Sequence, residues 1–231
     1  MAALSGWWDD FFFGTLMVLK VFSVALVVAV IFGLLGSSAK LSKSRPAQLA
    51  AKAYTVVFRG TPELVVLLLF YFGTAIVLTR LAQFYDPHIK FVDVPPFWAG
   101  STAIGLIVGS YMTETFRGAF LGVPHGQVEA AQALGLSKAQ TFFFVRVPQM
   151  WRLALPNFGN HMLSIMKDTA LVSIIGLEEV VFVGDLATSV NHKPFFMFMT
   201  VALIYLGITT VITLLVAGLE RYANRHMEGS R

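Results

Sequence analysis

The chain has 231 residues, of which 56% are hydrophobic and only 13% are charged. Because soluble globular domains carry about 25% charged residues, this composition excludes an ordinary soluble protein and indicates a membrane protein. The net charge of +4 is scattered over segments that flank apolar stretches, so we interpret it as an orientation signal and not as a nucleic-acid-binding surface. The absence of cysteine rules out disulfide bonds and thiolate metal sites.

The first predicted membrane span covers about residues 14–36, which is long enough to cross roughly 30 Å of hydrocarbon. Asp9 and Asp10, but no basic residue, precede Lys20, so we interpret this span as retained and not as a cleaved signal peptide. For Lys20 we favour a side chain that snorkels or faces a helix bundle over one on a transport pathway. The next segment, residues 37–60, is predicted to be a loop, and its five basic residues without an acidic one place it in the cytoplasm.

The second predicted span covers about residues 61–81. Its first residues, Thr61, Pro62 and Glu63, suit a helix N-terminus and its dipole. Glu63 therefore has a sufficient structural role, and a role in transport stays open.

The third predicted span, about residues 97–116, carries two features. Ser101, Gly105 and Gly109 recur at intervals of four, a stripe of small residues that lets a neighbouring helix approach closely. Glu114 and Arg117 follow three positions apart and can pair on one helix face. Two interpretations of Glu114 stay open: a self-satisfied ion pair, or a group that lines a cavity and favours cationic substrates.

A polar segment at about residues 124–148 separates the third and fourth spans. Residues 129–133 are good helix formers, Gly135 interrupts them, and Ser137 is a suitable N-cap for a second short helix. We expect Pro148 to end that helix. Because such a segment cannot lie in hydrocarbon, it must lie in water or dock on a soluble partner.

This segment resembles the EAA loop of inner-membrane permease subunits of ATP-binding-cassette importers, through five residues at matching spacing: Glu129, Ala130, Ala131, Gly135 and Pro148. The sequence departs from the family pattern at Val145 and Val147, where both changes keep an apolar side chain. Residues 59–64 and 111–135 resemble the polar-amino-acid branch of that family, and the second stretch is particularly similar to the Q-type permeases of histidine/lysine/arginine/ornithine importers. The resemblance implies that the loop contains a coupling helix seated on an ATPase subunit. We expect glycine at position 135 because a Cβ there could clash with the turn or with the partner.

The fourth predicted span, about residues 153–176, contains six polar residues: Asn157, Asn160, His161, Ser164, Lys167 and Asp168. At about 100° per residue they fall within an arc of roughly 120°. Such a stripe faces protein or a water-filled path and not lipid, so it either bonds to other helices or lines the translocation path, which we favour for part of it. His161 alone is better explained as a hydrogen-bonded interior histidine than as a ligand. Residues 167–171 also resemble a family segment in the same place.

The fifth predicted span covers about residues 195–218. The six segments that flank the spans have net charges of −2, +5, −1, +3, −2 and +1, where the last includes Glu228 and Arg231. This alternation predicts an all-α protein with five transmembrane helices, a periplasmic N-terminus and a cytoplasmic C-terminus. No soluble domain or linker is visible, so residues 1–231 read as a single transmembrane domain.

The resemblance implies a non-catalytic permease subunit, multi-pass in the bacterial inner membrane, that moves amino acids by ATP-driven alternating access. Basic amino acids are favoured, while glutamine, glutamate or opines stay open. Its expected partners are a second permease, either a homologous M-type subunit or a second copy, two ATPase subunits that bind ATP and Mg²⁺, and a periplasmic amino-acid-binding protein. The chain itself lacks a GxxxxGK[ST] phosphate loop, so no cofactor is expected on it.

Two other classes of protein are alternatives to this interpretation. An ion-coupled secondary transporter would need its own coupling site, which Glu63, Glu114 and Asp168 could supply. A membrane enzyme would need a catalytic constellation, and the five histidines show no metal-ligand spacing. Uptake driven by a proton gradient without an ATPase would decide for the first.

Overall fold

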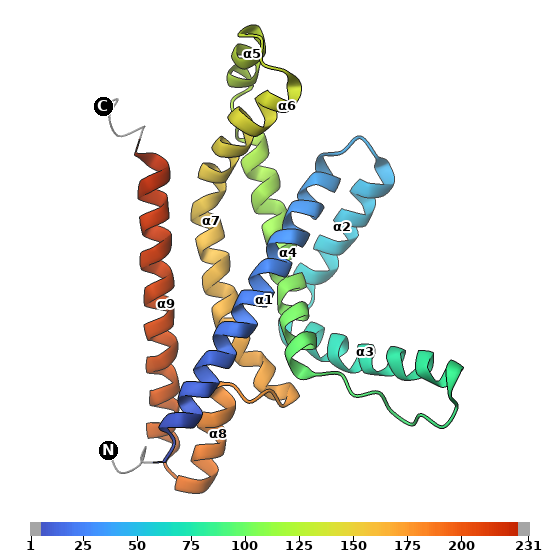
Figure 1. Ribbon diagram of the computed structural model, residues 1–231, viewed down its shortest axis with the longest axis vertical. Helices are drawn as coiled ribbons and strands as arrows, with labels where there is room; N and C mark the ends of the chain where they lie inside the picture. The colour runs from blue at the N-terminus through green and yellow to red at the C-terminus, as the bar shows by residue number, and fades with distance from the viewer. Residues whose placement is uncertain (1–5, 226–231) are drawn as a thin grey trace.

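A computed structural model describes residues 6–225, and all of the regular structure in that range is helical (Figure 1). The prediction of a helical protein is therefore confirmed for the described residues. The C-terminal charges of Glu228 and Arg231 lie outside them. The elements are, in chain order, α1 (Trp8–Leu41), α2 (Arg45–Gly60), α3 (Glu63–Tyr85), α4 (Pro96–Leu121), α5 (His125–Ala133), α6 (Lys138–Gln140), the π-helix η1 (Thr141–Arg146), α7 (Val147–Asp168), the 3₁₀-helix η2 (Thr169–Ile175), α8 (Val180–Asn191) and α9 (Pro194–Asn224).

Three of these helices, α1, α3 and α9, are long and apolar enough to cross a membrane. Helices α4 and α7 have 26 and 22 residues, which is sufficient length, but their polar and small residues lower their hydropathy. A helix whose polar face is covered by neighbours can still cross a bilayer. The chain thus has a membrane-protein architecture, and five crossings remain our prediction.

Two segments expected to be loops are helical. Residues 37–60 contain α2, which turns back on α1 and buries Ala51 and Thr55. The Tyr54 hydroxyl of α2 donates a hydrogen bond of 2.6 Å to the Leu106 carbonyl of α4. Residues 177–194 contain α8. Both helices are amphipathic and short, so tertiary packing and not span-like hydropathy stabilises them.

Helices α1 and α4 cross so closely that their contact depends on glycine. A Cβ at Gly105 of α4 would lie 2.9 Å from the Ala25 carbonyl oxygen of α1, and one at Gly36 of α1 would lie 2.3 Å from the Thr113 Oγ1 of α4. Gly109 is comparably crowded, by the backbone at Ala29. The predicted role of the small-residue stripe in helix packing is therefore confirmed.

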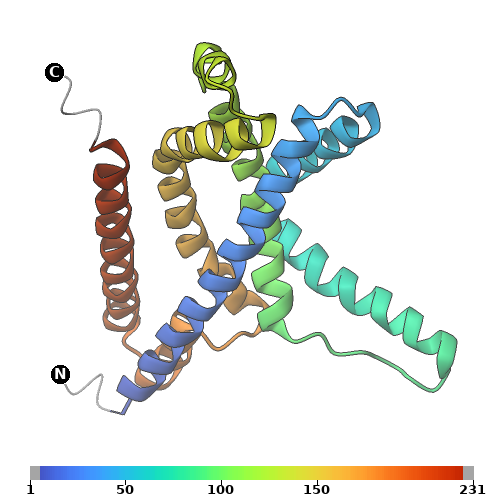
Figure 2. The same ribbon diagram turned by 45° about the horizontal axis from the view of Figure 1, so that its top comes forward.

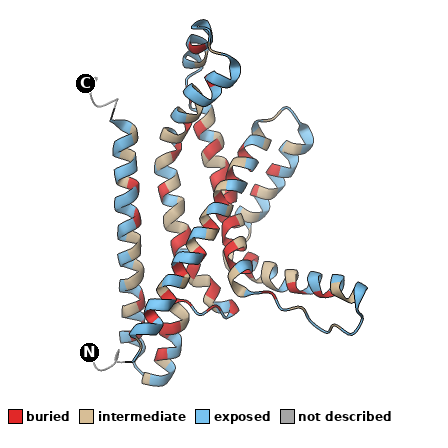
Figure 3. Cartoon of the chain, in the orientation of Figure 1, coloured by how far each residue is buried: buried red, intermediate tan, exposed pale blue. Residues whose placement is uncertain are grey.

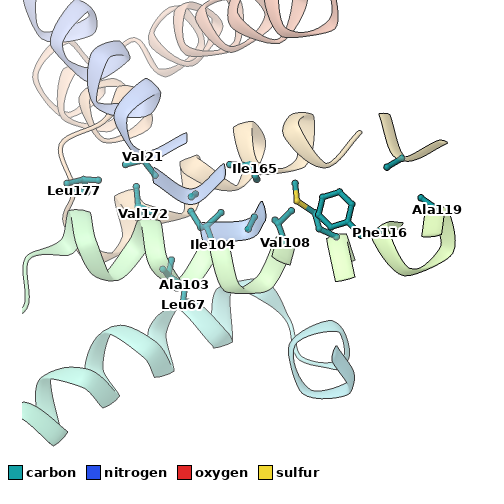
Figure 4. Close-up of a cluster of buried hydrophobic side chains, with 14 of the residues drawn as sticks. Val21, Leu67, Ala103, Ile104, Val108, Phe116, Ala119, Ile165, Val172 and Leu177 are labelled. Carbon is teal, nitrogen blue, oxygen red and sulfur yellow. The ribbon is translucent and has the colours of Figure 1, made fainter. Parts of the chain in front are cut away.

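The largest apolar core forms around α4, where buried residues concentrate (Figure 3). Val21 of α1, Ile165 of α7 and Val172 of η2 lie on the Ile104 side of α4, and Leu67 of α3 lies beside Ala103 (Figure 4). A second core joins α1 and α7 to α8 and α9. Helix α3 projects away from the others in both views, and α5 and α6 lie at the opposite end of the molecule from α8 (Figures 1 and 2).

A buried carboxyl group links three elements in the second core. Glu179 is 0% exposed, and its side chain caps α8 by accepting hydrogen bonds from the amides of Val181 and Phe182, at 2.9 and 3.0 Å. Its Oε2 lies 3.1 Å from the Tyr205 hydroxyl of α9, which lies 3.2 Å from the Thr169 hydroxyl of η2. This chain of polar contacts ties the end of α7 to α8 and α9.

We expect Gly105→Ala to destabilise the protein, because the added Cβ overpacks the α1–α4 crossing and overpacking costs about 1–3 kcal/mol. Gly73→Ala in α3 is the matched control, since no atom lies within 4 Å of its Cβ position. An alanine there gains helix propensity of about 0.5–1 kcal/mol. Thermal unfolding in detergent measures both variants, and equal midpoints would contradict the assigned role of Gly105.

Candidate functional site

The segment that joins α4 to α7, hereafter the elbow (residues 122–146), projects from one end of the molecule (Figure 1). Helix α5 ends in a Schellman motif: the amide of Leu136 donates to the Ala131 carbonyl at 3.1 Å, and that of Gly135 to the Gln132 carbonyl at 3.0 Å. Gly135 has a φ of +86°, and no atom lies within 4 Å of its Cβ position. The expected steric clash is thus absent within this chain, and the left-handed backbone is what requires glycine there.

The second helix of the elbow begins as predicted at Ser137. The Gln140 amide donates to the Ser137 hydroxyl at 3.3 Å, and the Ser137 amide donates to the Gln140 side chain at 2.9 Å, which completes a capping box. The expectation that Pro148 ends this helix is wrong, because α6, η1 and α7 follow one another without a break. A wider π-turn, in which the Val147 amide bonds to the Phe142 carbonyl, stands directly before the proline. Pro148 follows this π-turn inside the continuous helix, and the locally altered bonding pattern accommodates its missing amide hydrogen.

The π-helix η1 forms the junction between the elbow and α7. Two polar atoms in it, the Thr141 hydroxyl and the Arg146 Nε, are buried and have no hydrogen-bond partner. Unpaired buried polar groups and π-turns are both costly and tend to occur at functional positions. The junction is therefore less firmly bonded than the helices it connects.

The elbow presents most of its predicted coupling residues to the outside. Glu129, Ala130, Gly135 and Pro148 are exposed, while Ala131 is buried against its own chain. The Glu129 carboxylate lies 3.2 Å from the His125 Nδ1.

Sequence reasoning missed Leu134, which is 82% exposed at the tip of the elbow. Its signal was a large apolar residue directly before Gly135. A single exposed leucine carries no signal by itself, but its place beside Gly135, among the predicted coupling residues, makes Leu134 a candidate contact residue.

The polar stripe of α7 is only partly bonded. His161 Nε2 lies 2.8 Å from the Thr115 Oγ1 of α4, as expected for an interior histidine, and Ser164 donates to the Asn160 carbonyl at 3.3 Å. Asn157, Asn160 and Lys167 are exposed. The structure thus leaves part of the stripe available to a ligand or to another subunit.

Asp168 ends α7 beside Glu63, the first residue of α3, and the two carboxyl groups interact directly. The Lys167 charge also acts on Asp168. Folding therefore gives Glu63 a neighbour that its place at a helix N-terminus did not indicate. Two adjacent carboxyls form an acidic position at the end of the stripe, which we call the acidic pair.

Glu114 pairs with two cations. Arg117 Nε lies 2.9 Å from Glu114 Oε2, which confirms the predicted pair, and Lys40 of α1 binds the other oxygen. Lys40 also donates to the Thr55 hydroxyl of α2 at 2.7 Å. Sequence reasoning missed Lys40 because 74 residues separate it from Glu114. Glu114 is thus an ion-pair partner, and a free carboxylate for a cationic substrate is not present there.

A cavity of about 630 Å³ adjoins this ion-pair cluster, lined among others by Lys40, Lys52, Arg59, Tyr111 and Glu114. The Arg59 guanidinium lies over the Tyr111 ring, 5.1 Å from its centroid. Gly60, three residues before Glu63 of the acidic pair, also lines this cavity.

Comparison with known proteins places this fold and site among transporters. Residues 29–225 match the family of binding-protein-dependent transport system inner membrane components. The chain is 41% identical over 90% of both chains to the histidine/lysine/arginine/ornithine transport system permease protein HisQ of Escherichia coli. It is 37% identical to the octopine transport system permease protein OccQ of Rhizobium meliloti, over 89% of this chain and 86% of that one.

A solved structure shares the fold over nearly the whole chain. An amino acid ABC transporter crystallised with histidines matches with a TM-score of 0.80 and 32% identity, over 96% of this chain and 97% of that one. The chain belongs to the family of binding-protein-dependent transport system inner membrane components.

Proposed function

We propose that the chain is one permease subunit of an ATP-binding-cassette importer that moves basic amino acids inward across the bacterial inner membrane. The observation that carries this proposal is the exposed elbow, with a Schellman motif at the end of α5 and a capping box at the start of α6. It stands in a chain that matches amino-acid permeases along most of its length. In this role Glu129, Ala130, Gly135 and Leu134 contact an ATPase subunit. Ala131, which is buried, shapes the elbow from within, and Pro148 lies just beyond it in α7.

The proposed complex contains two ATPase subunits, which supply ATP and Mg²⁺, a second permease and a periplasmic binding protein. A homologous M-type permease fits the similarity to HisQ, and a second copy of this chain would serve the same purpose. Five crossings with the N-terminus outside agree with the alternating flank charges. They also agree with the positions of Trp8, at the start of α1, and Asn224, at the end of α9, at opposite ends of the molecule (Figure 1).

The translocation path follows the polar stripe of α7 in this proposal. The acidic pair of Glu63 and Asp168 would bind the positive side chain of a basic amino acid through charge-assisted hydrogen bonds. Exposed Asn157 and Asn160, with His161, Ser164 and Lys167, continue the stripe toward the elbow. Glu114, already paired, would organise the inner cavity and not bind substrate directly.

Alternating access requires the elbow to have two positions that an ATPase can bias. The Schellman motif and the capping box make its two helices rigid. The π-helical junction at Thr141 and Arg146, with its unpaired polar atoms, is the place where such a lever would pivot.

A second substrate class follows from a specific observation, namely the similarity to the octopine permease OccQ. Lys167 lies beside the acidic pair and offers a partner for an additional carboxylate. Reconstitution of the chain with its permease, ATPase and binding-protein partners tests the proposal. We expect lysine, arginine, histidine or ornithine to stimulate ATP hydrolysis and uptake, whereas stimulation by octopine or glutamine alone would assign the other class. Uptake driven by a proton gradient without ATP would refute the importer.

We expect Gly135→Leu to impair coupling, because a non-glycine residue in the left-handed region costs about 1–2 kcal/mol. This cost weakens docking of the elbow on the ATPase by roughly five- to thirtyfold. Co-purification of the ATPase and amino-acid-stimulated ATP hydrolysis measure the effect. Gly135→Asn should retain more coupling, since asparagine tolerates this backbone conformation. Gly126→Leu, equally uncrowded but within α5, controls for side-chain size, and equal losses in both leucine variants would contradict the backbone argument.

We expect Asp168→Asn to raise the amino-acid concentration for half-maximal uptake by roughly tenfold or more, since a hydrogen bond to a charged group contributes about 1.5–3 kcal/mol. Thermal stability should change little, because Asp168 is only partly buried. Asp185→Asn, an exposed carboxylate on α8, is the matched control. An Asp168→Asn transporter with the half-saturation of the unmodified complex would remove the acidic pair from the path.

A further inference from the structure

A row of polar contacts begins at Glu179. When its carboxyl group is ionised, the row has fewer hydrogens than contacts. Three pairs of oxygen atoms lie within hydrogen-bond distance: Glu179 Oε2 and the Tyr205 hydroxyl at 3.1 Å, the Tyr205 and Thr169 hydroxyls at 3.2 Å, and the Thr169 hydroxyl and the Met166 carbonyl at 2.7 Å. Each contact needs one hydrogen. The two hydroxyl groups supply two of them.

The carbonyl end of the chain decides the direction of the bonds. The Met166 carbonyl has no hydrogen, so Thr169 must donate to it and can only accept from Tyr205. Tyr205 has one hydrogen, which it donates to Glu179 Oε2 when that carboxyl group is ionised and can give to Thr169 when it is not. All three contacts are hydrogen bonds at the same time only if the carboxyl group of Glu179 provides the third hydrogen.

We propose that Glu179 is protonated in the folded chain and acts as a positioning residue for transport, holding the end of α7, and with it Asp168, through Tyr205 and Thr169. This inference rests on the proposed function for the part that concerns Asp168. Thr169 is 0% exposed and follows Asp168 directly, so a shift of Thr169 moves the acidic pair. Neither Glu179 nor Tyr205 needs to touch the substrate.

The surroundings of Glu179 favour the neutral form. Burial raises the pKa of its carboxyl group to about 7, although hydrogen bonds from the backbone amides of Val181, Phe182 and Val180 and from the Tyr205 hydroxyl oppose the rise. Tyr205 is the titratable group that meets it from α9.

The other elements packed against Glu179 bring it no counter-charge. Helix α1 presents Gly14, where an added Cβ would lie 3.2 Å from the Glu179 carbonyl carbon. From η2 it meets Thr169, whose neighbour Asp168 faces Glu63 instead. None of the ion pairs within residues 6–225 includes Glu179.

Loss of the Glu179 proton leaves one contact of this row without a hydrogen. The Tyr205 hydrogen turns to the carboxylate, and the contact between Tyr205 and Thr169 loses its hydrogen. The end of α7 is then held less firmly. As the pH rises through about 7, α8 and α9 therefore hold the end of α7 less firmly, and the proposed site binds an amino acid less tightly. A neutral isostere at residue 179 removes this contribution to the pH dependence of binding.

The first test uses the purified full chain in detergent and needs no partner. The folded carboxyl group keeps its proton to about pH 7, and the unfolded one loses it near 4.5. The stability that this protonation contributes is therefore fully present below pH 4.5 and is lost as the pH rises through 7. We expect the thermal midpoint to fall over this window and the fall to be smaller in Glu179→Gln, whose amide can still donate to Tyr205; any contribution of the acidic pair is common to both chains. Glu178→Gln, the exposed neighbour, should follow the unmodified chain. An unchanged pH profile in Glu179→Gln overturns the inference.

The second test measures the reconstituted importer. We expect the ratio of the half-saturating amino-acid concentration of the unmodified complex to that of Glu179→Gln to rise severalfold as the pH passes 7; the acidic pair is common to both complexes and cancels in this ratio. Tyr205→Phe should raise the half-saturating concentration at every pH without changing the maximal rate, a separation that a merely structural role would not produce.

Asp168→Asn separates the two proposals. If that variant loses affinity while Glu179→Gln keeps the unmodified pH dependence, only the positioning role is overturned. If Asp168→Asn transports normally, the proposed path is wrong, and the positioning role is overturned with it.

Discussion

The close crossing of α1 and α4 is the constraint on which the rest of the structure depends. Glycines at 36 and 105 let the two backbones approach so closely that a single added carbon would meet the facing helix. Without a hydrophobic driving force between helices in lipid, such van der Waals contact is a main source of association. With α1 and α4 locked together, α2 lies against α4 through Tyr54, α7 packs on α4 through Ile165, and both ends of the polar stripe acquire fixed positions.

Folding gathers charged groups in two neighbouring places. Carboxyls at Glu63 and Asp168 meet where α3 begins and α7 ends, and Lys40 and Arg117 surround Glu114, next to a cavity that also contains Arg59. Gly60 of the same cavity is only three residues before Glu63. Under the proposed function, the carboxyls attract a cationic amino acid and the cations repel it.

The two ends of α7 differ in how firmly they are held. The elbow end joins through a π-helix with unpaired polar atoms at Thr141 and Arg146, whereas the other end is fixed by the bonds from Thr169 to Tyr205 and Glu179. Under the proposed function, α7 would pivot at the elbow end and stay anchored at the other, and so transmit motion along its length. The anchored end is also the one next to the acidic pair, so its geometry is the part a substrate would sense.

The sequence by itself determined the helical membrane class, the elbow with its Ser137 cap, the small-residue stripe at Gly105 and the pair of Glu114 with Arg117. Each of these depends on residues close together in the chain, where local propensity and periodicity act. Only the tertiary structure decided that Pro148 lies inside a continuous helix, that Lys40 reaches Glu114, that Glu63 meets Asp168 and that Glu179 is buried against Tyr205. These pairs join distant segments, and their contacts follow from how helices pack and not from any local pattern.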